Sequence, residues 1–160
     1  MKAITILQPY ASLIACGEKR YETRSWPTKY RGRIAIHAGL GQQWDIMLMD
    51  DDYFEALVRG GITTIGKRYP NLPHGFIVAF ADITDCLKIT EYYGEHSDGV
   101  LLENNIKIDR NEMILGNYYP GRYAWKLENI HMLKTPIPAK GQQGLWTWDD
   151  AAAKNYEGGI

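Results

Sequence analysis

The sequence predicts a mainly β protein with helices, in which an antiparallel β-barrel is flanked by two or three helices. Six or seven short segments have the composition of strands, two or three have helical periodicity, and the two kinds do not alternate as βαβ units. A chain of 160 residues suits one domain. We expect this domain to occupy residues 1–150, and a flexible tail of small and polar residues to occupy 151–160.

The first part of the chain predicts a strand, a helix and two further extended segments. Residues 2–7 (KAITIL) form the strand, and 9–16 form a helix with apolar residues at helical spacing and proline in its first turn. Gly17 suits the left-handed conformation that ends a helix. The polar segment 19–26 is expected to be extended, and 33–38 (RIAIHA) reads as a strand.

The second part predicts one acidic helix and a series of strands. The helix spans 44–59, the proline-containing segment 66–75 is a loop, and 76–83 (FIVAFADI) is a central strand because it is nearly all apolar. A weak helix or turn is expected at 89–96, and the prolines at 136 and 138 are expected to break the chain. Further strands are predicted at 99–108, 122–134 and 145–148.

Composition excludes several classes of protein. The net charge of -1 gives no overall attraction to polyanions, so a nucleic-acid site must come from local charge. Cys16 and Cys86 are too few for a disulfide framework and predict buried free thiols in a reducing cytoplasm. The chain has neither the Cys/His spacing of a metal site nor an apolar run of membrane-spanning length, so we expect no metal, no cofactor and no membrane partner.

Cationic and aromatic residues alternate in the segment 17–37. It carries six Lys or Arg and two Glu, a local charge of +4, and Trp26 lies among them. Arginine suits phosphates and base edges, and aromatic rings stack on bases. Trp26 and Tyr10 are therefore candidates for stacking, while a solvated basic strand with inward-packed aromatics is the alternative. The candidate phosphate-binding or base-binding residues are Arg24, Lys29, Arg31 and Arg33.

Lys19, Glu22 and Arg24 lie within six residues of one another. In a regular strand Glu22 and Arg24 point to one face and Lys19 to the other, although Lys19 follows the helix directly. The three are either a structural ion-pair cluster or the floor of a polar pocket, where a partly buried lysine can act as base or nucleophile. Asp82, at the end of the apolar strand, is either a site residue or a turn cap.

Several segments, taken together and in order, resemble the ASCH domain family. Residues 8–14 (QPYASLI) precede Gly17-x-Lys19-x-x-Glu22-x-Arg24, which matches the central GxKxxExR motif of that family. Further matches are 78–86 (VAFADITDC), 123–129 (YAWKLEN) and 137–146 (IPAKGQQGLW). The resemblance covers about 2–148, essentially the whole predicted domain.

The resemblance implies a PUA-like β-barrel with a cleft between the barrel and the helix that carries QPYASLI. The GxKxxExR motif would line the floor of this cleft, and the family suggests that it binds RNA or a nucleotide, including a modified nucleoside. By position in the matched segments, Gln8, Pro9 and Lys140 join the candidate ligand-binding residues. The expected partner is therefore RNA or a nucleotide or nucleoside ligand.

Two alternatives remain open. Some family members resemble amidohydrolases that remove an acyl group from the exocyclic amine of cytidine, using a lysine, a threonine and a glutamate, and others are linked to RNA cleavage. Lys19 matches the lysine, Glu22 stands where those members have threonine, and Asp82 is the nearest match to their glutamate, one methylene shorter. These three are the candidate catalytic residues. The second alternative is a protein-interaction domain that uses the acidic helix 44–59.

Overall fold

The computed structural model describes residues 1–41, 51–62, 64–65, 69–70 and 72–151. Within these ranges the chain is mainly β with three α-helices and one 3-10 turn, as predicted. The helical elements are α1 (Tyr10–Ala15), α2 (Asp51–Arg59), η2 (Glu103–Asn105) and α3 (Arg110–Met113). The strands are β1 (Lys2–Ile6), β2 (Tyr21–Arg24), β3 (Gly32–Ala38), β4 (Thr64–Ile65), β5 (Tyr69–Pro70), β6 (Phe76–Tyr93), β7 (Gly99–Leu102), β8 (Lys107–Asp109), β9 (Tyr123–Pro138) and β10 (Leu145–Thr147).

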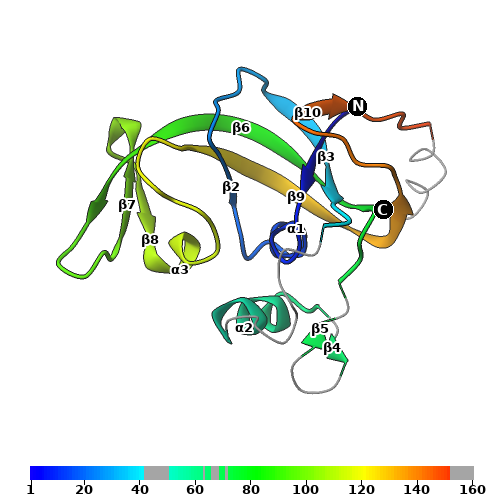
Figure 1. The fold of residues 1–160 in the computed structure, drawn as a ribbon, viewed down its shortest axis with the longest axis horizontal. Coiled ribbons are helices and arrows are strands. Elements are labelled where there is room, and N and C mark those ends of the chain that lie inside the picture. Colours follow the sequence, from blue (N-terminus) through cyan, green and yellow to red (C-terminus); the bar gives the residue numbers. More distant parts are fainter. Residues whose placement is uncertain (42–50, 63, 66–68, 71, 152–160) are drawn as a thin grey trace.

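Two long antiparallel strands, β6 and β9, form a ribbon that spans the molecule (Figure 1). At one end of the ribbon β6 pairs with β7, which pairs with β8 beside α3. At the other end β6 pairs with β3, and β1 and β10 continue the sheet. Within the described ranges, strand β2 pairs only with β9. The two ends of the ribbon therefore carry different sets of elements.

The sheet is mixed and open rather than a closed antiparallel barrel. Strands β1 and β3 are parallel, with Lys2 beside Ile34 and Ile6 beside Ala38. Among the described strands, the path from β10 to β8 is not joined into a ring. The prediction of an antiparallel barrel was right about the strand-rich class and wrong about the direction of this pair. The connection from β1 to β3 includes α1 and brings the chain back to the edge of the sheet where β1 begins. The two strands can therefore be parallel.

Strand β6 runs ten residues past the predicted end at 83, to Tyr93. Beyond the apolar stretch Leu87 and Ile89 are buried, whereas Lys88 and Thr90 are exposed. This period of two is that of a strand with one solvated face, so the predicted helix or turn at 89–96 was wrong for 89–93, although a turn does occupy 94–96. The predicted strand 99–108 is instead the hairpin of β7 and β8, interrupted by η2.

Strand β9 continues through Pro136, which was predicted to break it, and ends at Pro138, the second predicted break. The ladder with β6 passes from Ile77–Ile137 to Ala79–Met132, so several β9 residues, Pro136 among them, lie in an irregular stretch. A proline in a bulge has no ladder hydrogen bond to lose. Part of the predicted loop 66–75 contributes to the pairing of β4 with β5. Residues 44–50 of the predicted helix 44–59, and 152–160 of the predicted tail, lie outside the described residues.

Helix α1 covers one face of the sheet and holds the segment that follows it. Its buried side chains, among them Ala11 and Ile14, pack in a core with Ile34 and Ile36. The opposite face of the sheet has a second core around Phe80, Trp146 and Trp148. Helix α2 packs on α1 through Ala56 and Leu57. Within the described ranges, no helix combines the length and apolar character that crossing a membrane requires.

Candidate functional site

A polar cleft of about 770 Å³ opens beside the segment that joins α1 to β2. Its walls are this segment (17–21, here the motif loop), the end of α2, the β8–α3 region and the middle of β9. The residues that line the cleft are Gly17, Glu18, Arg20, Tyr21, Arg59, Lys107, Ile108, Asp109, Asn111, Glu112, Leu115, Lys126, Leu127, Glu128, Asn129 and Ile130.

Backbone hydrogen bonds fix the shape of the motif loop. Gly17 has φ +84°, the left-handed conformation predicted for the end of the helix, and its N–H donates to the carbonyl of Ile14. The N–H of Lys19 donates to Leu13, and the carbonyl of Arg20 accepts from Leu127 on β9. The loop is therefore held between α1 and β9.

Side chains of the motif loop divide between the cleft and the interior. Glu18, Arg20 and Tyr21 line the cleft. Lys19 and Glu22 are buried, with exposed fractions of 1% and 7%. Three motif side chains, those of Lys19, Glu22 and Arg24, were predicted to open into one hollow, but none of them is among the described lining residues. Of the defined positions of the GxKxxExR pattern, Gly17 lines this cleft, whereas the side chains of Lys19, Glu22 and Arg24 lie outside its described lining.

The ammonium group of Lys19 is buried inside the protein. Its Nζ lies 3.8 Å from Glu112 Oε1 and 5.1 Å from the centre of the Tyr118 ring, and it has no hydrogen-bond partner among the described residues. Gly116 packs so closely that a Cβ there would come within 2.6 Å of Nζ. Burial lowers the pKa of Lys19, and the charges of Glu112 and Glu22 oppose that shift only in part.

Glu112 on α3 connects the sealed lysine to the cleft wall. Its Oε2 accepts the backbone N–H of Arg20 at 2.9 Å, and its Oε1 accepts that of Tyr21 at 3.2 Å and the hydroxyl of Tyr118 at 2.6 Å. Burial and the neighbouring Glu112 hold the pKa of Tyr118 well above its usual value, so this hydroxyl remains a donor. Glu112 thus positions two residues that line the cleft.

Sequence reasoning missed Glu112. Asp109 and Glu112 have the spacing of a helix N-cap pair, and the Asp109 side chain does accept from the Glu112 N–H at 3.0 Å. This signal could have located α3. It could not have shown that the helix packs on a loop 91 or 92 residues away in sequence.

Glu22 and Arg24, the other two motif charges, bind each other and the neighbouring strand. Arg24 Nε lies 2.8 Å from Glu22 Oε1, and its Nη2 donates to the carbonyl of Thr5 at 2.8 Å. Trp26 packs edge-on against Trp125 with ring centres 4.7 Å apart, and its carbonyl accepts from the Trp125 indole. In this conformation these contacts hold β2 against β1 and β9.

The predicted residues at the start of α1 also have protein partners. Gln8 donates through Nε2 to Pro73 and accepts through Oε1 from the Ser12 N–H. Pro9 is buried, and Tyr10 meets the Tyr53 ring edge-on at 5.8 Å. None of Gln8, Pro9 and Tyr10 is among the described cleft-lining residues.

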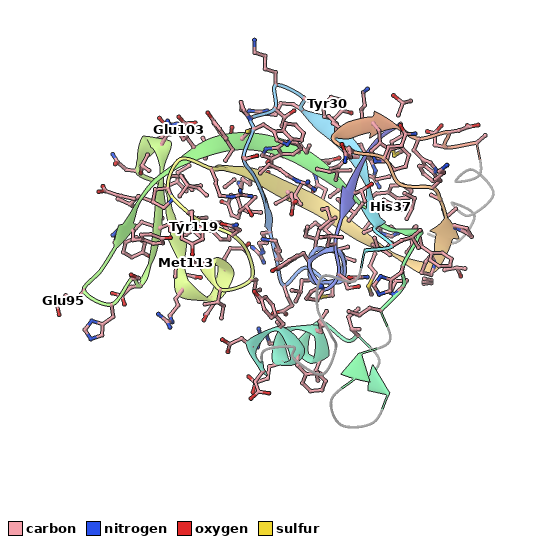
Figure 2. The ribbon with its side chains drawn as sticks, in the orientation of Figure 1. Tyr30, His37, Glu95, Glu103, Met113 and Tyr119 are labelled. Carbon is pink, nitrogen blue, oxygen red and sulfur yellow. The ribbon has the colours of Figure 1, made fainter. Side chains whose placement is uncertain are left out.

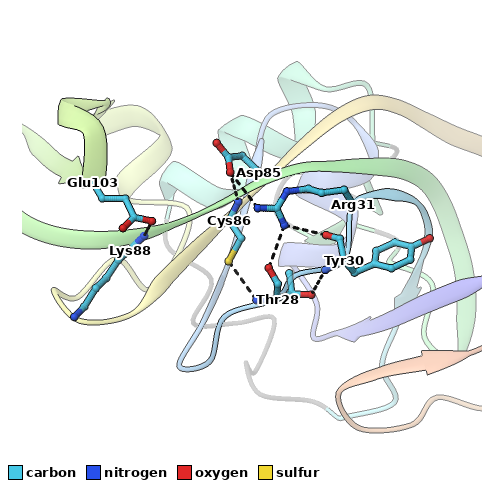
Figure 3. Close-up of polar contacts among 7 residues, drawn as sticks. All are labelled: Thr28, Tyr30, Arg31, Asp85, Cys86, Lys88 and Glu103. Carbon is cyan, nitrogen blue, oxygen red and sulfur yellow. Dashed lines mark hydrogen bonds and ion pairs between the residues drawn. The ribbon is translucent and has the colours of Figure 1, made fainter.

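The predicted cations beyond β2 lie outside the described lining of the cleft. Arg31 donates to the carbonyls of Thr28 and Tyr30 and pairs with Asp85 at 3.2 Å (Figure 3). Figure 2 shows Tyr30 away from the β7–β8 end, where Met113 and Tyr119 lie. Arg33, over the Phe80 ring, is exposed, as are Lys29 and Lys140. None of these four cations lines the cleft within the described part of the chain.

Asp82 lies on the sheet face opposite α1. It is connected to the cleft through a hydrogen bond with Asn129. It is paired in register with Arg33, on the side of Phe80. Its Oδ2 accepts from Asn129 Nδ2 at 2.8 Å. Asn129 has φ +49°, lies in a bulge of β9 and lines the cleft. No contact of the described residues joins Asp82 to Lys19 or Glu22.

Among the described residues, two ion pairs have both partners in the lining of the cleft. Arg59 lies 2.8 Å from Glu18, and Lys126 lies 2.9 Å from Glu128. The hydrogen bond between Lys126 and Glu128 raises the pKa of Lys126 and lowers that of Glu128. In the part of the chain that the structure describes, no three His, Cys, Asp or Glu side chains are grouped as metal ligands.

The model of the ASCH domain matches residues 4–137, most of the chain. The chain belongs to the ASCH domain family. A crystal structure of ASCH from Zymomonas mobilis superimposes with a TM-score of 0.50 at 14% identity, covering 99% of this chain and 94% of that one. That likeness supports the fold assignment.

Two proteins named activating signal cointegrator 1 are similar in sequence. The one from Homo sapiens is 23% identical over 157 residues, and the one from Mus musculus is 24% identical over 160 residues. Each alignment covers 98% of this ASCH domain and 24% of the relative. The chain thus spans about a quarter of the length of these relatives.

Proposed function

We propose that this ASCH domain binds single-stranded RNA or a nucleotide in the cleft beside the motif loop. The observation that carries the proposal is the composition of one cleft: Arg20 and Lys107 line it together with the ring of Tyr21. A volume of about 770 Å³ suits a ligand of nucleotide size. Bound nucleotides need cations for phosphate and a ring for the base.

The acidic residues of the cleft favour a short ligand over a long duplex. Glu18, Asp109, Glu112 and Glu128 also line it, so the surface is not a uniform basic groove. Carboxylates repel a polyphosphate backbone but can accept hydrogen bonds from the exocyclic amines of bases. The free thiols of Cys16 and Cys86 are in keeping with the reducing cytoplasm that we propose as its location.

Fluorescence anisotropy with short RNA, DNA of the same sequence and a duplex tests this proposal. We expect single-stranded RNA to bind most tightly, with an affinity that falls as salt rises. Tyr21→Leu removes one ring from the cleft and should weaken binding by about 1–3 kcal/mol, the usual contribution of a stacked base. The matched control is Tyr119→Leu, because Tyr119 is 65% exposed and is not a described lining residue. Equal effects of the two substitutions, or no binding at low salt, would refute the proposal.

A second candidate function is hydrolysis of an N-acylated cytidine. It is supported by the lowered pKa of Lys19 and by the contact of that amine with Glu112, which lines the cleft. An amine with a lowered pKa can serve as base or nucleophile near neutral pH. Since Lys19 is sealed, turnover requires the Glu112 side chain to move. Release of acetate from N4-acetylcytidine that Lys19→Met abolishes would support this function, and unchanged release would remove Lys19 from it.

A further inference from the structure

The four cations of the cleft fall into two pairs with different electrostatic surroundings. Arg59 is neutralised by Glu18 at 2.8 Å, and Lys126 by Glu128 at 2.9 Å. Arg20 and Lys107 have no carboxylate within ion-pair distance among the described residues. An incoming anion is therefore attracted by the full charges of Arg20 and Lys107. The ion pairs of Arg59 and Lys126 each present only a dipole.

Both unpaired cations are attached to ordered parts of the wall. The Arg20 N–H is held by Glu112 at 2.9 Å, so the root of this side chain is fixed on the motif loop. The Lys107 ammonium lies 5.1 Å from the centre of the Tyr93 ring, which holds the cation without neutralising it. The motif loop and β8 belong to different walls of the cleft.

We infer that Arg20 and Lys107 form a phosphate-binding subsite, and that the ligand is therefore a phosphorylated nucleotide rather than a free nucleoside. This inference rests on the proposed function and narrows its ligand class. A guanidinium offers a planar pair of donors and an ammonium a compact charge, a combination that suits the oxygens of one phosphate.

The test compares cytidine monophosphate with cytidine by isothermal titration calorimetry on the full chain. We expect the monophosphate to bind at least about tenfold more tightly, since charge-assisted hydrogen bonds to phosphate are the stronger kind. Arg20→Gln and Lys107→Gln should each remove most of this preference, because each weakens monophosphate binding far more than cytidine binding.

The matched controls are Arg59→Gln and Lys126→Gln, which remove lining cations that already have carboxylate partners. We expect each control to change the affinity for the monophosphate by less than about threefold. All four side chains are at the surface or at the cleft, so thermal unfolding should confirm that each variant is folded.

The outcomes separate this inference from the proposed function. If the parent binds nucleoside and monophosphate equally, or if the controls lose as much affinity as the Arg20 and Lys107 variants, the subsite is refuted while nucleotide binding stands. If neither these probes nor short RNA binds, both proposals are refuted. A preference for the monophosphate that only the Arg20 and Lys107 variants lose would establish the subsite.

Discussion

The buried ion pair of Lys19 and Glu112 and the solvent-exposed ion pair of Arg59 and Glu18 are two different kinds of electrostatic site. Lys19 and Glu112 lie 3.8 Å apart with exposed fractions of 1% and 13%, whereas Arg59 and Glu18 lie 2.8 Å apart in a more exposed setting. Exposed pairs contribute little to stability, while removing one partner of a buried pair leaves an uncompensated charge. Burial, rather than distance, therefore decides which of the two pairs the fold depends on.

The strongest test of this contrast is Glu112→Ala. It removes the acceptor for two backbone N–H groups and for Tyr118, and it leaves the Lys19 ammonium buried without its nearest carboxylate. We expect the free energy of unfolding to fall by about 3–5 kcal/mol. Urea titration measures the change.

Glu103→Ala is the matched control for the Glu112 substitution. Glu103 also accepts a backbone N–H, that of Lys88 at 3.0 Å, but it is exposed (Figure 3). We expect a loss of less than about 1 kcal/mol. Equal losses in the two variants would show that the sealed site has no special role in the fold.

The packing around the sealed amine is tested by Gly116→Ala. The added Cβ would come within 2.6 Å of Lys19 Nζ and 2.9 Å of the Tyr118 ring. Overpacking of this kind costs about 1–3 kcal/mol. The double variant with Lys19→Met, whose side chain is shorter, should recover part of the loss in a double-mutant cycle. Additive effects would argue against direct contact.

The two kinds of site also predict opposite responses to alkaline pH. The pKa of Lys19 is lowered from 10.5, so between its folded pKa and 10.5 the unfolded chain holds a proton that the native chain lacks, and stability rises with pH. The pKa of Lys126 is raised, so its contribution is present below 10.5 and is lost as pH rises through the folded value. The free energy of unfolding should be measured over this pH range. Its rise with pH should be absent in Lys19→Met and retained in Lys126→Gln.

The smallest effect on stability is expected for the solvent-exposed ion pair of Arg59 and Glu18. Arg59→Gln breaks the contact with Glu18 at the cleft edge, where solvent screens both charges. The free energy of unfolding should change by less than about 1 kcal/mol, and the change should shrink further in high salt. A loss comparable with that of Glu112→Ala would remove the distinction between the two sites.

Local patterns in the sequence predicted the surroundings of the site well. Gly17 was expected in the left-handed conformation and has φ +84°. The segment from Tyr21 was expected to be extended and forms β2. The alternation of Leu87 and Ile89 with polar neighbours was also present in the sequence, so the full length of β6 could have been read from it.

The long-range contacts could not be predicted in the same way. Whether Lys19 faces solvent or the interior depends on Glu112, Gly116 and Tyr118, which follow it by more than ninety residues in the sequence. Spacing within the motif left both a structural cluster and a pocket floor open. Only the packing of α3 on the motif loop shows that Lys19 lies behind the cleft wall.

The distance between the walls of the cleft depends on the curvature of the ribbon that β6 and β9 form. Helix α1, which carries the motif loop, packs on the middle of this ribbon, whereas β8 and α3 are attached through β7 to the far end of β6. Beneath α1 and just beyond it, the ladder has irregularities at Phe80/Asp82 and Ile83/Asp85, where a strand bends most readily. Since the β9 residues opposite these bends also line the cleft, closure on a guest molecule would alter amide hydrogen exchange on both strands of the ribbon.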